Sequence, residues 1–209
     1  HIRAVVAQAP ADTDAFTVCP QEEVGAFFLN PVYGSEATDS GALATAQKVF
    51  DLAHVPLEIK SQVMDSSEIV YSNYVIAKPR YWRLWLDLVE VIYRHADAEQ
   101  DNELKRELCT VTQYDGGVQR KVFLIECLPS MLFRLHQMKV QPIPVNHELA
   151  GKGVLYPYRQ QSWVCDALKK AFKQSGEARY LQAFHEVSQK VLDNFQSTQP
   201  AAQPRMVMV

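Results

Sequence analysis

The sequence predicts an α/β fold, in which a core of strands and helices is followed by C-terminal helices. Residues 71–77 are rich in aromatic and β-branched side chains, which favour a strand, and Pro79 then suits the first turn of a helix. Amphipathic stretches at residues 163–172 and 177–195 predict two helices near the end of the chain. The length of 209 residues accommodates one domain with a helical extension.

The composition divides the chain into three parts. We expect an α/β core over residues 1–150 and a helical extension over residues 151–197. Residues 198–209 contain prolines and few large side chains before Met206, which predicts a disordered tail.

Charge and cysteine content narrow the classes of function. The net charge of -3 and the pI near 6.1 provide no basic surface for a phosphate backbone, which argues against nucleic-acid binding. The four cysteines are far apart and form no zinc-binding pattern, as expected for free thiols in a reducing cytoplasm. No apolar run approaches the roughly 20 residues that span a bilayer. We therefore expect a cytoplasmic protein without a transmembrane segment, and a position at the inner face of the membrane stays open.

The first third of the chain alternates short regular elements with a long loop. Residues 2–9 are apolar enough for a short helix or strand, and residues 15–18 predict a strand. Glycines, prolines and an Asn-Pro pair predict an ordered loop over residues 19–41. Apolar residues at helical spacing predict a helix over residues 42–53, and residues 57–64 favour a second, shorter one.

The helix that follows Pro79 has the clearest amphipathic pattern in the sequence. Its apolar face includes Trp82 and Trp85, which we expect to anchor the core because large aromatic side chains remove much apolar surface from water. The opposite face carries charged residues at helical spacing, as expected for a surface helix.

A second helix, over residues 118–135, is apolar on most sides and is therefore expected to be buried. It contains Glu126 and Pro129, two residues that a buried helix normally avoids. Glu126 has two interpretations: a functional carboxylate, or the partner of a cation in an ion pair with Arg120, Arg134 or Lys78. Further along the chain, prolines within residues 139–145 predict an edge strand.

The sequence Asp12-Thr13-Asp14 is formally an Asp-x-Asp motif. In nucleotide-sugar enzymes such a motif holds a divalent metal through hard carboxylate oxygens. The alternative is a role in a turn or a helix cap, which the position of this motif before its neighbouring strand favours.

No dinucleotide-binding glycine motif, phosphate-binding loop, nucleophile elbow or zinc-protease motif occurs. Two blocks of the sequence nevertheless resemble bacterial polysaccharide glycosyltransferases of the capsular and lipopolysaccharide type. The first block is similar to the Asn-aromatic-x-x-Ala-Lys-x-x-Phe/Trp junction of those proteins, and the second to their helix that carries Glu-Arg-Leu. The two blocks are Tyr71-Ser72-Asn73-Tyr74-Val75-Ile76-Ala77-Lys78-Pro79 with Tyr81-Trp82, and Lys121-Val122-Phe123-Leu124-Ile125-Glu126. Cys127 stands where that family has an arginine.

This resemblance implies a GT-A-like, Rossmann-like core that is incomplete at its N-terminus, with the nucleotide-binding portion upstream of His1. It also implies transfer of a sugar from a nucleotide-sugar donor to a hydroxyl of a glycan acceptor on the bacterial surface. Such a reaction uses a carboxylate base and cations that neutralise the leaving diphosphate, including a divalent Mn²⁺ or Mg²⁺.

The resemblance assigns roles to individual residues. Asp65 and Glu126 are the expected catalytic carboxylates. Asn73, Tyr74 and Lys78 are the expected substrate contacts. His147 is the expected diphosphate or metal contact, with Asp12 and Asp14 as further metal ligands.

Two alternative functions stay open. The chain could be a non-catalytic binding domain whose helices over residues 163–195 dock a partner or join two copies into a homo-oligomer. It could also be a different small-molecule enzyme that uses the strand-to-helix junction at Asn73.

Overall fold

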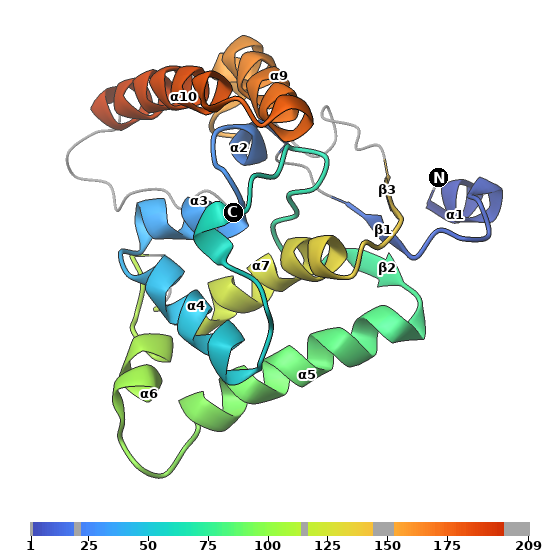
Figure 1. The fold of residues 1–209 in the computed structure, drawn as a ribbon. Coiled ribbons are helices and arrows are strands. Elements are labelled where there is room, and N and C mark those ends of the chain that lie inside the picture. Colours follow the sequence, from blue (N-terminus) through green and yellow to red (C-terminus); the bar gives the residue numbers. More distant parts are fainter. Residues whose placement is uncertain (1, 19–21, 114–116, 144–152, 199–209) are drawn as a thin grey trace.

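Helices make up most of the structure, and a three-stranded sheet lies at one side of it (Figure 1). The computed structural model describes residues 2–18, 22–113, 117–143 and 153–198. Strands and helices occur together, so the predicted α/β class is confirmed at this level. Helix α1 (Ile2–Gln8) lies beside the sheet, away from the other helices, and has no buried residue.

The sheet is mixed and its strands are short. It consists of β1 (Ala15–Thr17), β2 (Val75–Ala77) and β3 (Val140–Pro142) in the order β2-β1-β3. Strand β1 pairs antiparallel with β2 and parallel with β3. The strand predicted over residues 15–18 and the edge strand predicted over residues 139–145 are therefore confirmed in part of their length.

Two helices occupy the segment that was predicted to be a loop, so that prediction was wrong for most of residues 19–41. They are α2 (Glu22–Ala26) and α3 (Pro31–Thr38). The Asn30-Pro31 pair begins α3: the Asn30 Oδ1 accepts hydrogen bonds from the backbone N–H groups of Val32 and Tyr33, at 3.1 and 3.3 Å. The Asn30 Nδ2 also donates to the Ile59 carbonyl at 2.9 Å, so this fully buried residue joins two segments.

The helices between residues 42 and 108 follow the predicted pattern with two differences. Helix α4 (Ala42–Leu52) and helix α5 (Pro79–Ala96) were predicted, whereas α6 (Glu103–Leu108) was not, and a 3₁₀ turn, η1 (Ile59–Ser61), replaces the predicted short helix. Tyr81 and Ile92 of α5 are fully buried, at 1% and 0% exposure, while Trp82 and Trp85 are half-buried against the core. Tyr81 stacks against Phe133, with ring centroids 5.2 Å apart.

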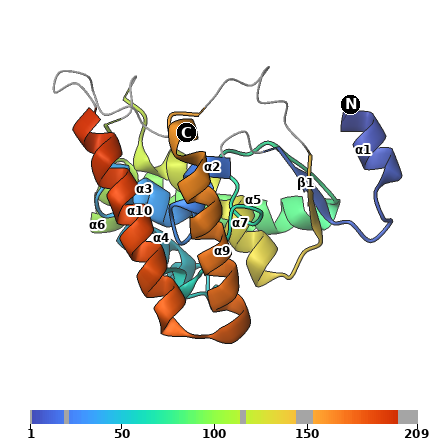
Figure 2. The ribbon, with the colours of Figure 1, turned by 90° about the horizontal axis from the view of Figure 1, so that it is seen from above.

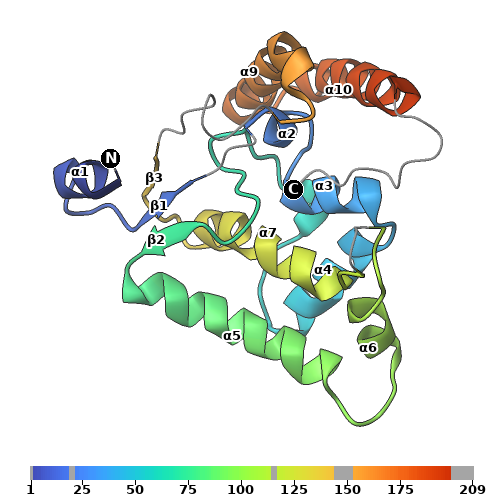
Figure 3. The ribbon, with the colours of Figure 1, turned by 180° about the vertical axis from the view of Figure 1, so that it is seen from behind.

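Helix α7 (Arg120–Leu135) passes through the middle of the helical part of the molecule, in contact with α3, α4, α5 and α6 (Figure 1 and Figure 3). This confirms the helix predicted over residues 118–135. The helix continues through Pro129, which lacks the N–H that would bond to the Ile125 carbonyl. Most of its side chains after residue 123 are buried, so α7 fixes the position of every residue that it carries.

The C-terminal helices form an antiparallel pair that rests on α2 (Figure 1 and Figure 2). After a short turn, η2 (Tyr156–Tyr158), α9 (Arg159–Ser175) and α10 (Ala178–Thr198) are joined at Gly176. Lys169 on α9 is fully buried, and its Nζ donates to the carbonyls of Gly25 and Phe28, each at 2.9 Å. These are carbonyls at the C-terminal end of α2, where the helix itself supplies no donor.

The predicted division into an α/β core over residues 1–150 and a helical extension over residues 151–197 stays a prediction. Helix α10 ends at Thr198, one residue beyond the predicted end of the helical extension. The predicted tail over residues 198–209 begins with this last residue of α10, and its residues 199–209 lie outside the described residues, as does the boundary at residue 150. Within the described ranges, no helix has the length and apolar character needed to cross a membrane.

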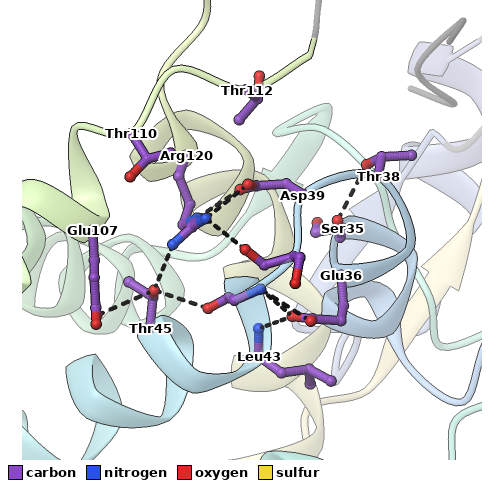
Figure 4. Close-up of polar contacts among 12 residues, drawn as sticks. Ser35, Glu36, Thr38, Asp39, Leu43, Thr45, Glu107, Thr110, Thr112 and Arg120 are labelled. Carbon is purple, nitrogen blue, oxygen red and sulfur yellow. Dashed lines mark hydrogen bonds and ion pairs between the residues drawn. The ribbon is translucent and has the colours of Figure 1, made fainter.

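A buried ion-pair network holds the beginning of α7 against the loop between α3 and α4 (Figure 4). The Arg120 guanidinium donates to both Asp39 carboxylate oxygens, at 2.6 and 2.8 Å, and to the Ser40 carbonyl at 2.8 Å. It also donates to the Thr45 hydroxyl at 3.1 Å. Both charged side chains are nearly inaccessible, at 7% and 11% exposure, so neither charge is stabilised by water.

We expect Arg120→Ala to lower the free energy of unfolding by about 3–5 kcal/mol, because the Asp39 carboxylate would remain buried without its cation. Urea denaturation measures this change. The control is Arg106→Ala, which removes an exposed ion pair with Asp101 and should cost about 0–1 kcal/mol. Equal losses in the two variants would contradict the role of the Arg120 network.

Candidate functional site

The chain bends sharply just before β2, at the junction that the sequence marked as a candidate site. Ser72 has a φ of 76°, a left-handed conformation that is unusual for a residue other than glycine. The Val75 N–H donates to the Asn73 carbonyl at 2.9 Å, which closes a tight turn. The predicted strand over residues 71–77 is therefore shorter than expected, because its first four residues form this bend.

Asn73 and Tyr74 lie differently with respect to the interior. The Asn73 Oδ1 is buried and has no hydrogen-bond partner in the described part of the chain, which is uncommon for a buried carbonyl oxygen. The Tyr74 side chain is 66% exposed, and its backbone carbonyl accepts from the Val18 N–H at 3.0 Å. The Asn73 oxygen therefore lies in the interior without a described partner, while the Tyr74 ring lies on the outer surface.

Glu126 lies on the face of α7 that packs against the segment leading to Asn73. Residues 123, 126 and 130 share one face of the helix. The Ser130 Oγ accepts a hydrogen bond from the Val70 N–H at 2.7 Å, and Phe123 lines a small cavity together with Tyr71. Glu126 is thus placed between two points at which α7 meets residues 70–71.

The Glu126 carboxyl is half-buried, and burial raises its pKa above the ordinary value. It makes neither a hydrogen bond nor an ion pair with the residues that the structure describes. The three cations considered from the sequence have other partners: Arg120 binds Asp39, Arg134 binds Glu68, and Lys78 lies near Asp14. The ion-pair interpretation of Glu126 is therefore wrong for these three residues.

Helix α3 packs against Tyr71, close to the junction, and sequence reasoning missed this helix. Gly34 approaches Tyr71 so closely that a Cβ on residue 34 would lie 2.5 Å from the tyrosine hydroxyl oxygen. Ser35, Thr38 and Asp39 line the same small cavity, whose volume is about 20 Å³. The segment was expected to be a loop, and its one available signal was the Asn-Pro pair that begins the helix.

Asp65, the other expected catalytic carboxylate, belongs to a different cluster. It is buried, accepts from the Ser67 N–H at 3.0 Å, and forms an ion pair with Lys173 of α9 at 3.1 Å. Burial works to raise the pKa of Asp65, but hydrogen bonds from Ser67 and Lys173 outweigh it and the net shift is downward. Asp65 therefore ties the C-terminal helices to the core.

Lys78 and the Asp-x-Asp motif lie at the opposite end of β2 from Asn73, on the order of 10 Å along the strand. The Lys78 Nζ donates to the Ala11 carbonyl at 3.1 Å and lies 3.7 Å from an Asp14 carboxylate oxygen. Asp12 forms an ion pair with Lys139. In the described ranges no group of three or more His, Cys, Asp or Glu side chains could hold a metal ion, and His147 lies outside those ranges.

We expect Glu126→Gln to raise the free energy of unfolding at neutral pH by roughly 0.5–2 kcal/mol, because an ionised carboxylate would no longer be desolvated. Because the pKa of Glu126 is raised in the folded chain, the desolvation of its carboxylate lowers stability only at a pH above the ordinary carboxyl pKa of 4.5. Below that pH the carboxyl is protonated in both the folded and the unfolded chain, and the cost disappears. The gain in stability should therefore grow as the pH rises from about 4 to about 8, as measured by urea denaturation.

The matched control for this prediction is Glu90→Gln, which changes an exposed carboxylate on α5 in the same way and should leave the pH dependence unaltered. If Glu126→Gln instead lowered stability at neutral pH, the carboxylate would have a stabilising partner and would not be a free group at the site.

Comparisons with known proteins give no family for this chain. No protein-family model, no curated protein and no solved structure matches it. The functional argument therefore depends on the geometry around Asn73 and Glu126.

Proposed function

We propose that this chain belongs to a GT-A-like glycosyltransferase that transfers a sugar from a nucleotide-sugar donor to a hydroxyl of a bacterial surface glycan. The observation that supports this proposal is Glu126, a half-buried carboxyl with a raised pKa and no cation beside it among the described residues. Such a group is suited to accept a proton from a hydroxyl. The parallel pairing of β1 with β3 is compatible with part of a Rossmann-like sheet.

In the proposed reaction, the acceptor hydroxyl oxygen forms a bond to the anomeric carbon of the donor sugar. The hydroxyl proton moves to a Glu126 carboxylate oxygen. The bond between the anomeric carbon and the diphosphate oxygen breaks, and its electron pair leaves with the nucleoside diphosphate. Asn73, at the bend before β2, is the proposed contact that orients the sugar.

Two of the other expected roles fit the described contacts less well. Asp65 is a weaker candidate for the base than Glu126, because Lys173 and Ser67 already stabilise its charged form. Asp12 and Asp14 each lie beside a lysine, so they do not fit as ligands of a divalent cation. The proposal therefore assigns no step to a metal ion, and the test compares binding with and without Mn²⁺.

The test is a thermal-shift panel of nucleoside diphosphates and nucleotide sugars, with and without Mn²⁺, followed by an assay of nucleoside diphosphate release. A ligand at 100 times its Kd should stabilise the chain by about 2.7 kcal/mol. Glu126→Gln should keep this stabilisation and lose about 10²–10⁴-fold in the rate of release. Glu90→Gln should change neither quantity.

Two results would count against the proposal. The absence of a shift with every member of the panel would remove the donor, and an unchanged rate in Glu126→Gln would remove the base. Asp65→Asn distinguishes the two carboxylates, since it should reduce stability through the loss of the Lys173 pair while the folded fraction keeps its rate.

A second candidate function is a non-catalytic interaction domain that associates through α9. Trp163 and Val164 are 66% and 48% exposed on this helix, and adjacent exposed apolar side chains are typical of an interface. Sedimentation velocity tests this candidate. The chain should form a dimer, and Trp163→Ser should dissociate it. The control Lys170→Ser, on the same helix, should leave the dimer intact. A monomer at all concentrations would exclude this candidate function as a dimer.

A further inference from the structure

A cavity of about 530 Å³ lies beside the second half of α7, within the size range of small-ligand sites. Its walls come from residues 67–70, the last turns of α7 and β3. Val70 and Ser130 belong both to this wall and to the contact that places Glu126. Ser130 is one helical turn from Glu126, about 6 Å along the helix axis.

The charged groups in the cavity wall neutralise one another. The Glu68 carboxylate accepts from the Arg134 Nη1 at 2.8 Å and forms a second ion pair with Lys173. Lys173 also binds Asp65, and neither of these two residues lines the cavity, so the wall itself carries one carboxylate and one cation that are paired. A diphosphate or another anion would find no uncompensated cation there, which favours a neutral ligand.

Two polar side chains in the wall keep hydrogen-bonding capacity. Arg134 uses one N–H group for Glu68, and its other N–H groups have no partner in the described part of the chain. The side-chain amide of Gln137 likewise has no described partner and can both donate and accept. Phe133, Met138 and Val140 supply apolar surface between these groups. Directional polar groups around an apolar patch suit a ring with several hydroxyls and apolar C–H faces.

We propose that this cavity binds a neutral sugar residue of the acceptor glycan and presents the acceptor hydroxyl along α7 toward Glu126. This inference rests on the proposed glycosyltransferase function and adds the chemical class of the acceptor. An acidic sugar is disfavoured, because its carboxylate would face Glu68, and the one cation in the wall, Arg134, is already paired with that carboxylate.

The test is nuclear magnetic resonance of the chain with ¹³C-labelled methionine methyl groups. Met138 lines the cavity, whereas Met64 and Met131 are buried in the core and serve as internal controls. The probes are methyl glucoside, methyl galactoside, methyl glucuronide and uridine diphosphate. At least one neutral glycoside should shift the Met138 methyl signal with saturation, while the signals of Met64 and Met131 stay in place.

A matched pair of variants tests the contact with Gln137. Gln137 and His54 both follow a helix and have positive φ angles, of 48° and 54°, so glycine suits the backbone at either position. Gln137→Gly removes the amide from the cavity and should weaken glycoside binding about tenfold, the effect of one lost hydrogen bond of about 1.4 kcal/mol. His54→Gly makes the same backbone change outside the cavity and should leave binding unchanged.

The inference would be overturned if neither neutral glycoside shifted the Met138 signal up to about 10 mM, which is ten times the Kd of a weak site of about 1 mM. Stronger binding of the glucuronide or of uridine diphosphate would also overturn it. So would equal affinities of the two variants for the glycoside. The titration needs neither donor nor turnover. Saturable glycoside binding without release of a nucleoside diphosphate would therefore contradict the proposed function alone. Turnover without a Met138 shift would contradict the cavity assignment alone.

Discussion

The buried pair between Arg120 and Asp39 is the interaction on which the rest of the helical core depends. It joins the first residue of α7 to the loop between α3 and α4, through two hydrogen bonds that match the geometry of a carboxylate. Because α7 packs against four other helices, the rotation of this helix decides which of its residues face the junction at Asn73. The pair resists a change of that rotation, because turning α7 away would leave both charges buried without a partner.

Some charged side chains of α7 have an ion-pair partner and Glu126 has none among the described residues, and this difference supports the proposed site. Arg120 at the beginning of the helix and Arg134 near its end are both neutralised by carboxylates. Glu126 between them has no such partner among the described residues, although burial makes its charged form costly. A protein that compensates its other charges on one helix and leaves one carboxyl uncompensated loses stability there, as active sites commonly do.

The C-terminal helix pair is attached to the core by two lysines of α9 as well as by apolar side chains of both helices. Lys169 caps α2, and burial lowers the pKa of its ammonium group to about 8 despite the nearby Asp166. Lys173, one turn further along α9, is exposed and binds Asp65 and Glu68. Glu68 also lines the proposed acceptor cavity. The attachment of the helix pair and the chemistry of the proposed acceptor cavity therefore depend on shared residues.

The sequence alone determined the long amphipathic helices and the short strands at Ala15–Thr17 and Val140–Pro142, because hydrophobic periodicity and proline positions act over a few residues. It also singled out Glu126 as a carboxylate in an apolar helix. Only the tertiary structure decided that Lys78 lies at the other end of β2 from Asn73 and that the three cations considered as partners of Glu126 lie beside other carboxylates. Pairings between residues far apart along the chain depend on how the elements pack, and no local pattern records them.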